Sequence, residues 1–429
     1  MSEANWTKEQ LGDFCHVVGG GTPSRQNPRY WHGSIPWASV KDFKDGQRFI
    51  ADTEEHITPS GLAGSASRQI PAGTPLVCTR MAVGRSAIPL QDTAINQDVK
   101  ALFTDGKMSA DYLQRLLGFH ENDISRTAVG STVKGISTKE LLLLQVFFPV
   151  DLAQQARIAE ILDTADAAIR ESESVLAKLR QLKAGLLHDL LTCGLDANGR
   201  LRDPLRYPEQ FQDSPLGRIP KAWDATTLGQ VIAEHGGMLQ TGPFGSQLHS
   251  RDYSKHGVAV VMPQDIDDNG EIDVTGAAKI LESRSVPLSR HRLRPTDLVF
   301  ARRGDLSRCG VLQPGANAIC GTGCLLFRPP EKVLLSGWFA MAYRHDFCQR
   351  QIANKAVGTT MVNLNTQLLN SLWLRLPSYE EQKQILAHLT DSVERIAAEE
   401  SRLAKLHEIK RGLAHDLLSG RVRVIPMEI

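Results

Sequence analysis

The sequence lacks several features that would assign it to common classes of protein. No run reaches the roughly 18 consecutive apolar residues of a membrane-spanning helix, and the first residues carry neither the basic nor the apolar segment of a secretion signal. The seven cysteines are scattered without paired spacing, which indicates free thiols rather than a disulfide framework. The formal net charge is only +1, so any surface that binds a polyanion must gather positive charge locally. These absences favour a cytoplasmic protein that does not contact a membrane.

Two long stretches, near residues 151–192 and 378–420, repeat apolar residues at alternating steps of four and three. The mean step of about 3.5 residues is typical of a coiled-coil seam. The sequence therefore predicts two long helices, each of about 40 residues and roughly 60 Å, that pack against each other. Ser172 and Glu399 are polar exceptions within the seam. The predicted seam positions are Ile158, Leu162, Ile169, Leu176, Leu179 and Leu186 in the first stretch, and Ile385, Leu389, Ile396, Leu403, Leu406 and Leu413 in the second.

The two stretches also share residue identities at a constant separation. Lys178 aligns with Lys405 (405 − 178 = 227), and both stretches end in Gly-Leu-x-His-Asp-Leu-Leu at the same offset. Upstream, the opening Trp-x4-Leu-Gly occurs at Trp6 and again at Trp223. The repeat therefore comprises a whole half of the chain.

Each half is predicted to be a block of mixed α and β structure followed by a long helix. Short strands are expected at Ile35–Val40, Leu76–Thr79, Val258–Met262 and Leu298–Ala301, between glycine and proline breaks. The Gly- and Pro-rich segment between the halves predicts an extended connector, which would let the helices lie antiparallel with the blocks at opposite ends. The expected fold is α+β with a pseudo-twofold repeat. Its segments are a first block 1–150, a helix 151–192, a connector 193–222, a second block 223–377, a helix 378–420 and a tail 421–429.

These features together resemble the DNA specificity subunit of type I restriction-modification systems. The resemblance covers nearly the whole chain and rests on the half-chain repeat, the Trp-x4-Leu-Gly openings, the run 214–223 and the heptad helices. It implies that the blocks are target recognition domains, each reading one half of a split double-stranded DNA sequence, and that the helices form an antiparallel spacer. It also implies docking of two methyltransferase subunits, with restriction subunits in a larger assembly. The first block lacks the Leu-Gly-x-Ile-Pro segment found before Trp223, so no contact of that segment carries over to it.

The resemblance implies that this chain is not an enzyme and binds no cofactor, while its partners use S-adenosylmethionine, ATP and Mg²⁺. The sequence contains neither the Gly-Lys-Ser/Thr ending of a P-loop nor the Asn-Pro-Pro-aromatic motif of adenine methyltransferases. Cys320, Cys324, His345 and Cys348 are too loosely spaced to favour a zinc site over buried thiols. Two other classes stay open from the residues. One is an enzyme with an unrecognised methyltransferase or nuclease centre, and the other is a DNA-binding scaffold or repressor without modification partners.

Candidate DNA-contacting residues fall into three kinds of segment that both blocks share. A Gly-rich loop with small hydroxyl residues lets the backbone approach phosphate. Strand ends place Arg, Lys or Gln where they could reach a base edge, and a late polar turn offers Asn for adenine and Ser or Thr for phosphate. The candidates are Thr22, Ser24, Arg25, Lys41, Arg80, Arg85, Ser131, Thr132 and Lys134 in the first block, and Ser246, Gln264, Arg302, Arg303, Arg308, Thr359, Thr360, Asn363 and Asn365 in the second.

Arginine is dense in the second block between Arg284 and Arg308. At this density it offers phosphate neutralisation and bidentate contacts to guanine, each worth about 1–3 kcal/mol. A solvated charged face is an equally good interpretation of any single arginine, and a plain surface turn is an equally good interpretation of the loop residues. Arg302 is favoured because Arg80 follows the equivalent strand of the first block.

Overall fold

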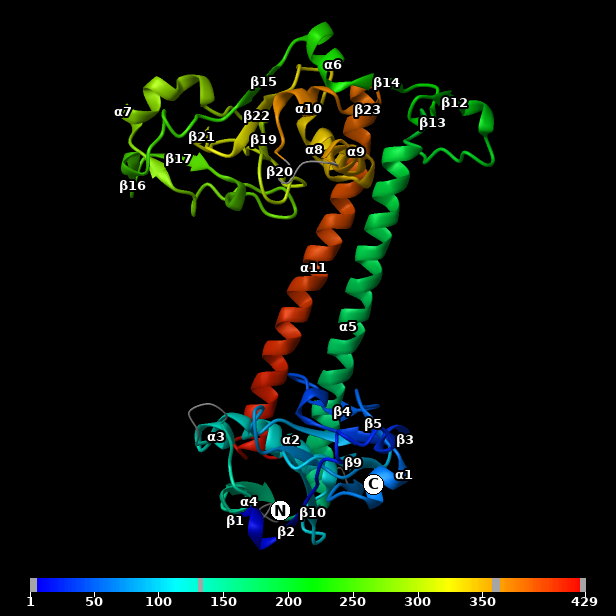
Figure 1. The fold of residues 1–429 in the computed structure, drawn as a ribbon, viewed down its shortest axis with the longest axis vertical. Coiled ribbons are helices and arrows are strands. Elements are labelled where there is room, and N and C mark those ends of the chain that lie inside the picture. The colour runs from blue at the N-terminus through cyan, green and yellow to red at the C-terminus, as the bar shows by residue number, and fades with distance from the viewer. Residues whose placement is uncertain (1–5, 130–133, 357–362, 425–429) are drawn as a thin grey trace. The chain divides into compact units, whose positions relative to one another are not determined.

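The computed structural model describes residues 6–129, 134–356 and 363–424. The candidates Ser131, Thr132, Thr359 and Thr360 lie outside the described residues. The chain divides into two compact units: unit 1 comprises Met1–Val175 with Glu399–Ile429, and unit 2 comprises Leu176–Ala398. Each unit therefore contains one α/β block and part of both long helices (Figure 1).

The long helices are α5 (Leu152–Thr192) and α11 (Tyr379–Leu418). Asp151 caps the start of α5 by accepting a hydrogen bond from Ala153 N at 2.9 Å, and Ser378 does the same for α11 through Glu381 N at 3.2 Å. Gly194 and Gly420 follow the two helix ends with φ of 62° and 70°, which is the left-handed conformation that terminates helices. The helix bounds are therefore set by local signals that the repeat preserves.

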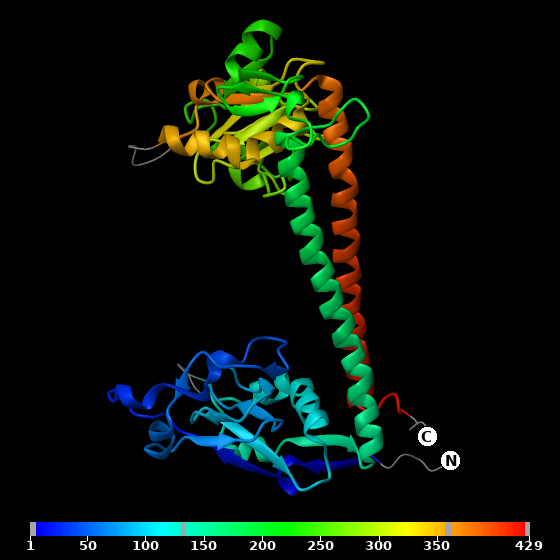
Figure 2. The same cartoon turned by 90° about the vertical axis from the view of Figure 1, so that its right-hand side faces the viewer.

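Within unit 1, the first part of α5 lies beside the last part of α11 and runs in the opposite direction (Figure 2). Asp166 pairs with Lys410 at 2.6 Å, whereas Ser172 Oγ donates to Glu399 Oε1 at 2.5 Å, so the residue number falls along α11 as it rises along α5. Ser172 and Glu399 are separated by the repeat offset of 227 residues. Equivalent positions of an antiparallel pair meet at its local two-fold axis, so the two polar exceptions of the seam are partners.

Every predicted seam residue is buried or half-buried. In unit 1, Ile158 and Leu162 are almost completely buried, and in unit 2 the same holds for Ile385. The half-buried positions include Leu179 and Leu406, as expected for a two-helix pair that exposes the flanks of its seam.

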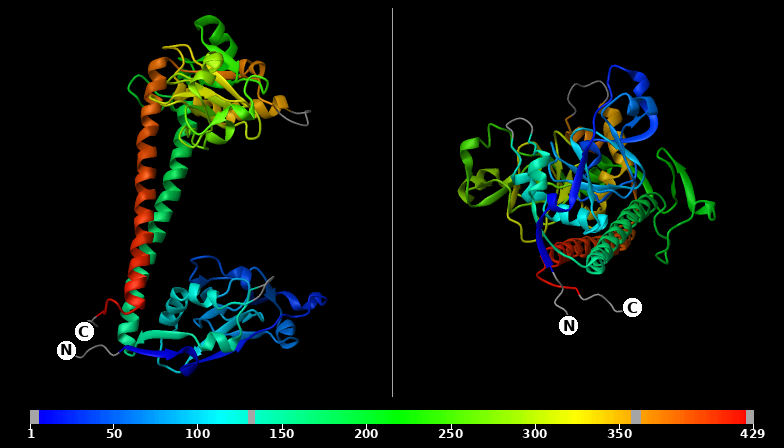
Figure 3. Two further views of the ribbon diagram at one scale, coloured as in Figure 1. Left: turned by 90° about the vertical axis from the view of Figure 1, so that its left-hand side faces the viewer. Right: turned by 90° about the horizontal axis from the view of Figure 1, so that it is seen from below.

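The block of unit 1 is built from mixed sheets that lie to one side of its helix pair (Figure 3). One sheet has the strand order β2-β10-β7-β8-β4, another has the order β5-β3-β9-β6, and β1 pairs with β11. The strands are β1 (Trp6–Gln10), β2 (Cys15–Gly19), β3 (Trp31–Ala38), β4 (Phe49–Ile50), β5 (His56–Ile57), β6 (Arg68–Ile70), β7 (Leu76–Cys78), β8 (Ser86–Pro89), β9 (Thr93–Ile95), β10 (Val99–Thr104) and β11 (Gln145–Pro149). The helices are α1 (Pro59–Ala63), α2 (Ala110–Phe119), α3 (Glu121–Arg126) and α4 (Thr138–Leu142).

The block of unit 2 repeats this plan. Its sheets have the orders β15-β22-β19-β20 and β16-β18-β17-β21, and β14 pairs with β23. The strands are β12 (Phe211–Ser214), β13 (Gly217–Pro220), β14 (Asp224–Thr227), β15 (Met238–Thr241), β16 (Tyr253–Ser254), β17 (Val258–Val261), β18 (Lys279–Ile280), β19 (Leu298–Ala301), β20 (Cys309–Val311), β21 (Ala318–Cys320), β22 (Cys324–Arg328) and β23 (Trp373–Leu376). The helices are α6 (Leu228–His235), α7 (Glu282–Ser285), α8 (Ser336–Arg344), α9 (Asp346–Ala356) and α10 (Thr366–Asn370). The α+β fold class predicted from the sequence is confirmed.

Two local expectations need correction. The strand expected to reach Val40 ends at Ala38, because Ser39 N donates to Asp42 at 2.7 Å and starts a 3-10 turn. The connector is folded rather than extended: its β12 and β13 form a hairpin, and Arg202 pairs with Glu381 at 2.6 Å. A polar partner on α11 holds the connector, and composition alone could not indicate that contact.

Each block is joined to the first turn of a long helix by a buried glutamine, Gln155 in unit 1 and Gln382 in unit 2. Both amides donate twice to backbone carbonyls and accept once from a backbone N–H. The partners are Pro149 O (2.9 Å), Lys107 O (2.9 Å) and Ser109 N (3.0 Å) for Gln155, and Pro377 O (3.0 Å), Val333 O (2.9 Å) and Leu335 N (2.8 Å) for Gln382. The repeat has therefore kept a polar joint inside the apolar core.

Candidate nucleic-acid interface

Four segments meet at one edge of the sheets in each unit, and we call this edge the strand-end surface. In unit 1 it comprises residues 19–25, 40–42, 79–81 and 134–138. The segments are held by backbone hydrogen bonds: Gly21 N donates to Ile95 O at 3.1 Å, and Ile136 N donates to Thr79 O at 2.9 Å. A Cβ on Gly20 would lie 1.9 Å from Ile95 O, so this loop requires glycine to approach the strand.

Unit 2 forms its strand-end surface from residues 241–246, 263–265, 301–303 and 363–365. Gly242 N donates to Cys324 O at 2.9 Å, and Arg302 N donates to Gly323 O at 2.8 Å. Leu364 N then donates to Arg302 O at 3.0 Å. The three kinds of segment selected from the sequence are thus brought together in both units, although the acceptors of these hydrogen bonds are not equivalent residues.

The 3-10 turns after β3 and β17 complete the two surfaces. They span Val40–Asp42 and Pro263–Asp265, and in each an Asp accepts a hydrogen bond from the backbone at the start of the turn. These turns expose Lys41 and Gln264 at matching positions. The predicted match between these two side chains is therefore a match in structure.

An open cleft of about 370 Å³ lies on the strand-end surface of unit 1 and is lined by Arg80, Gln97 and Lys100, among others. Thr22 Oγ1 donates to Gln97 Oε1 at 2.5 Å, and Lys100 Nζ donates to Gln97 O at 2.6 Å. Arg80 is 59% exposed and lies 3.7 Å from Asp98. Burial lowers the pKa of Lys100. Lys134 borders this region, because its carbonyl accepts from Met81 N at 3.1 Å. Cations and hydroxyl groups therefore line a cleft open to a ligand.

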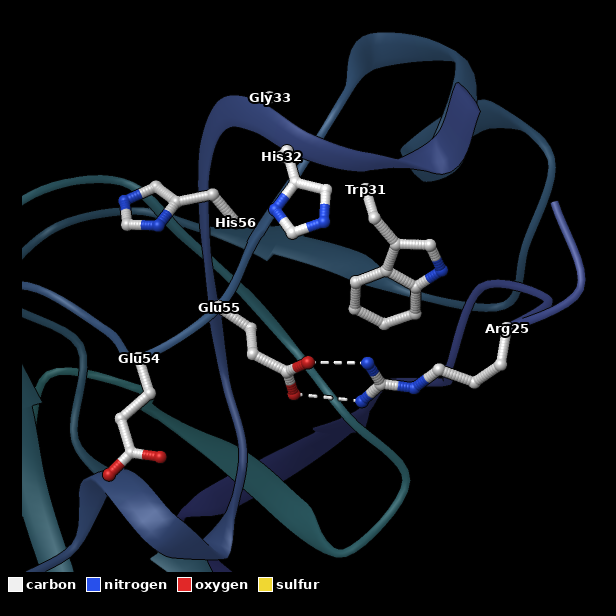
Figure 4. Close-up of a pocket in the computed structure, with 7 residues that line it drawn as sticks. All are labelled: Arg25, Trp31, His32, Gly33, Glu54, Glu55 and His56. Atoms are coloured by element: carbon white, nitrogen blue, oxygen red, sulfur yellow. Dashed lines mark hydrogen bonds and ion pairs between the residues drawn. The ribbon is translucent and has the colours of Figure 1, made fainter. Parts of the chain in front are cut away.

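A second cavity, of about 210 Å³, lies next to Arg25 (Figure 4). The Arg25 guanidinium stacks over the Trp31 ring at 3.7 Å and forms a bidentate pair with Glu55, in which Nη2 donates to Oε2 at 2.8 Å. Trp31 Nε1 donates to Ser24 O at 3.1 Å and so fixes the loop that carries Arg25. The hydrogen bond from Arg25 lowers the pKa of Glu55.

The strand-end surface of unit 2 carries a different set of groups. Arg303 Nε donates to Asn363 Oδ1 at 3.1 Å, and both side chains are exposed. Arg302 is half-buried, and its Nε has no hydrogen-bond partner among the described residues. The oxygen of Asn365 accepts from Leu368 N at 2.7 Å and caps α10, so its amide is not free to pair in bidentate fashion with adenine. Ser246 is exposed on the Gly-rich loop.

Other arginines selected from the sequence hold the fold together. Arg85 donates to Phe43 O at 3.2 Å and lies 3.7 Å from Glu121. Arg308 donates to Ile266 O at 3.2 Å and lies 3.7 Å from Asp305. Within the arginine-rich stretch, Arg284 pairs with Asp252 at 3.1 Å and Arg292 pairs with Glu282 at 2.7 Å. The density of arginine in unit 2 therefore reflects ion pairing within the block as well as the exposed groups.

Sequence reasoning missed Gln97, Lys100 and Glu55, because they lie on strands or turns that carry no motif. It also missed Gln155 and Gln382, although their separation equals the repeat offset and could have indicated them. The cysteine and histidine cluster is divided between two cores: Cys324 packs with β21 and β19, and Cys348 packs with α8. Burial raises the pKa of both thiols to about 12. The His345 ring lies 5.4 Å from the His188 ring.

Among the helices formed by the described residues, none has both the length and the apolar character needed to cross a membrane. The fold and the site instead define a class of duplicated proteins. In each unit of this chain, an α/β block with exposed cationic and amide groups on one edge is joined to an antiparallel pair of helix segments.

The chain belongs to the type I restriction modification DNA specificity family, whose model matches residues 3–181 and 265–408. It is 31% identical over 199 residues to the EcoR124I/EcoR124II specificity subunit of Escherichia coli, which covers 44% of this chain and 48% of that protein. It is 21% identical over 435 residues to the MjaVIII specificity subunit of Methanocaldococcus jannaschii, which covers 98% and 93%. The chain spans about half the length of the first curated relatives that it matches, at 48% and 53%.

Solved structures share the fold. A chain from a study of complex assembly and conformational transition of the type I R-M system has a TM-score of 0.63 at 16% identity, covering 97% of this chain and 98% of that one. The S subunit from M. genitalium has a TM-score of 0.52 at 15% identity, with 97% coverage of both chains. The resemblance drawn from the sequence is confirmed.

Proposed function

We propose that this chain reads a bipartite double-stranded DNA target, using the strand-end surface of unit 1 for one half-site and that of unit 2 for the other. The observation that carries the proposal is the repeated frame, in which backbone hydrogen bonds bring a Gly-rich loop, a strand end and a polar turn together in both units. The frame is shared while the exposed side chains differ, as expected if two readers recognise different sequences.

In this proposal the chain is not an enzyme, and two methyltransferase subunits methylate an adenine in each half-site. Restriction subunits join the larger assembly. S-adenosylmethionine, ATP and Mg²⁺ belong to those partners. The relatives named above support this role, since they are specificity subunits of type I restriction enzymes. Flipping a base out of the duplex costs a few kcal/mol, so a separate chain that grips the DNA on both sides serves the reaction.

The test is methylation mapping of DNA incubated with the methyltransferase chain, with and without this protein. The expected result is methylated adenine in a split motif only when both chains are present. Methyl transfer by this chain alone would show instead that it carries a catalytic centre. A repressor without modification partners would bind the split site and fail to co-purify with a methyltransferase.

The long helices offer a repeated outer stripe for docking the methyltransferase. Leu182 is 69% exposed in unit 2, and Ile409, at the repeat offset, is 55% exposed in unit 1. Three residues further along, Gly185 and Gly412 face open space, since nothing lies within 4 Å of a Cβ at either. An exposed helical glycine costs about 1 kcal/mol relative to alanine, so its presence at both positions favours close approach of a partner helix.

The double variant Gly185→Gln with Gly412→Gln tests this stripe. We expect the free chain to fold with unchanged or slightly higher stability, because glutamine favours helix more than glycine. Co-purification with the methyltransferase should be lost. Gly118→Gln, at another exposed helical glycine with open space around it, is the matched control and should keep the complex.

The helix pair is proposed to set the distance between the half-sites. A heptad inserted into both α5 and α11 lengthens the pair by about 10 Å, which corresponds to roughly three base pairs at 3.4 Å each. Methylation mapping should then show both half-motifs unchanged and the gap between them longer. An unaltered gap would refute the spacer role.

A further inference from the structure

The ion pair of Arg25 and Glu55 is both fixed in geometry and exposed to solvent (Figure 4). The guanidinium is already fixed, because it stacks on Trp31 at 3.7 Å and Glu55 holds both of its terminal amino groups. Yet the Arg25 side chain is 55% exposed and that of Glu55 is 30% exposed. A preorganised arginine loses little conformational entropy on binding.

We propose that Arg25 and Glu55 together read one G·C base pair in the half-site bound by unit 1. The inference rests on the proposed DNA-reading function and adds the chemistry of one contact. Glu55 presents two coplanar acceptors to Arg25, and guanine presents two coplanar acceptors, O6 and N7, in the major groove. The adjoining cytosine presents the N4 amino donor, which a glutamate accepts.

The exchange conserves hydrogen bonds. When the Arg25 fork turns from Glu55 to guanine, the carboxylate loses its partner and gains the cytosine amino group beside it. Neither the guanidinium nor the carboxylate is left without a hydrogen-bond partner, which would otherwise cost binding free energy. An A·T pair cannot replace the contact in this way, because neither of its bases offers two adjacent acceptors to the guanidinium: adenine has N7 beside its N6 amino donor, and thymine has O4 beside its methyl group.

The charge around the cavity favours a base edge over a backbone phosphate. Glu54 and Glu55 both line it, together with His32 and His56. His56 Nε2 lies 2.9 Å from Asp52, which adds a third carboxylate to the neighbourhood. A phosphate in this place would meet these carboxylates, whereas the edge of a guanine carries no net charge.

Unit 2 has no glutamate at the equivalent position. The carbonyl of Glu55 accepts from Trp37 N at 2.9 Å, and the carbonyl of Ala278 accepts from Val260 N at 2.7 Å in the corresponding strand pairing. The frame therefore accepts alanine where unit 1 has Glu55. Because the fold does not require a glutamate at this position, the side chain here is free to determine which DNA sequence is recognised.

The test selects bound sequences from a randomised duplex library, using the full-length chain in complex with its methyltransferase. The parent complex should select a split motif. Arg25→Ala should lose the preference for G·C at one position of one half-motif by about 10-fold or more, with every other position unchanged. Arg25→Lys should weaken it, because an ammonium can contact guanine but cannot form the planar fork. Arg29→Ala, on the same loop and exposed, is the matched control and should select the parent motif.

The variant Glu55→Ala distinguishes recognition of a base pair from non-specific attraction between Arg25 and the DNA phosphates. It should weaken the same G·C preference and raise the affinity for unselected DNA, because the freed guanidinium can then reach phosphates. Retained selection of the other half-motif shows that each variant is folded. Unchanged preference in Arg25→Ala overturns the inference, as does uniform weakening over all sequences with a smaller salt slope, which is the signature of a phosphate contact. If the parent selects no split motif, the proposed function itself fails.

Discussion

In both units an α/β block is joined to the helix pair through the same glutamine contacts. The side chains around this joint differ between the two units. Gln155 and Gln382 occupy this joint identically in each unit. Around Gln155, however, the joint is ionic: Arg115 is only 6% exposed and pairs with Asp163 and with Asp166, and Asp166 also pairs with Lys410 at 2.6 Å. Arg48 extends the network through Asp163.

Unit 2 has few charges at the corresponding places. The positions equivalent to Arg115, Asp163 and Asp166 are Met341, Thr390 and Val393. Met341 packs against the core instead of forming an ion pair. The comparison teaches that a duplicated fold keeps the contacts that fix the backbone, while the side chains between them diverge. A buried glutamine with three backbone partners has no simple substitute, but an ion pair and an apolar contact can fill the same space.

The largest effect should come from breaking what both units share. Leu179→Asp combined with Leu406→Asp places a carboxylate in the seam of each unit, and we expect a loss on the order of 5 kcal/mol or more, because each charge loses hydration against an apolar surface. Circular dichroism should show loss of helix. Retained helix content and unchanged DNA affinity would count against the seam. Leu205→Asp, at a side chain that is 92% exposed, is the control.

The next largest effect tests whether the glutamine joint is equivalent in the two units. Gln155→Ala and Gln382→Ala each remove the partner of one buried carbonyl, one part-buried carbonyl and one part-buried N–H, so we expect about 2 kcal/mol of destabilisation from each. Hydrogen exchange should localise the loss to α2 in the first variant and to α8 in the second. A large loss in only one unit would show that the joints are not alike.

A further loss of stability is expected to differ between the two units. Asp166→Ala leaves Lys410 without this partner and Arg115 with Asp163 alone, so we expect about 2 kcal/mol of destabilisation of unit 1. Val393→Ala, at the equivalent position of unit 2, should cost below about 0.5 kcal/mol because Val393 is 46% exposed. Urea unfolding of both variants measures the difference. Equal costs would remove the distinction between an ionic and an apolar joint.

The smallest effect concerns pH. Burial, followed by the neighbouring His188, lowers the pKa of His345, while Asp346 raises it and Arg375 and Arg350 lower it further. The folded state therefore binds fewer protons than the unfolded state, so this contribution to the stability of unit 2 is complete above the ordinary histidine pKa of about 6.5 and is lost as the pH falls.

His345→Phe installs an aromatic ring that does not titrate, as Phe119 provides in unit 1, where it lies 6.2 Å from His415. We expect the melting temperature of the parent to fall more than that of the variant between pH 7.5 and pH 5.5. His407→Phe, at an exposed position, should behave as the parent does. Identical pH profiles for parent and His345→Phe would contradict the assignment.

Local signals predicted much of this fold. The heptad steps placed α5 and α11 within two residues of their observed ends, because an apolar seam, a cap and a terminal glycine are encoded next to one another. The three kinds of candidate segment were also found from the repeat, because the same loop must approach the same strand in both blocks. The connector was predicted as extended, and its contact with Glu381 lies too far along the sequence for composition to indicate it.

The sequence by itself determined the duplication, the two long helices and the family. Each of these follows from residue identities and spacings that can be read without knowing any contact between distant residues. Only the tertiary structure decided which charged groups are available to a ligand. Arg25 and Arg85 look alike in the sequence, yet one stacks on an indole beside an open cavity and the other is held by Phe43 O and Glu121. Whether an arginine is open to a ligand or engaged within the fold depends on acceptors contributed by distant parts of the chain. An ion pair forms between groups that are close in space, which the sequence alone does not show.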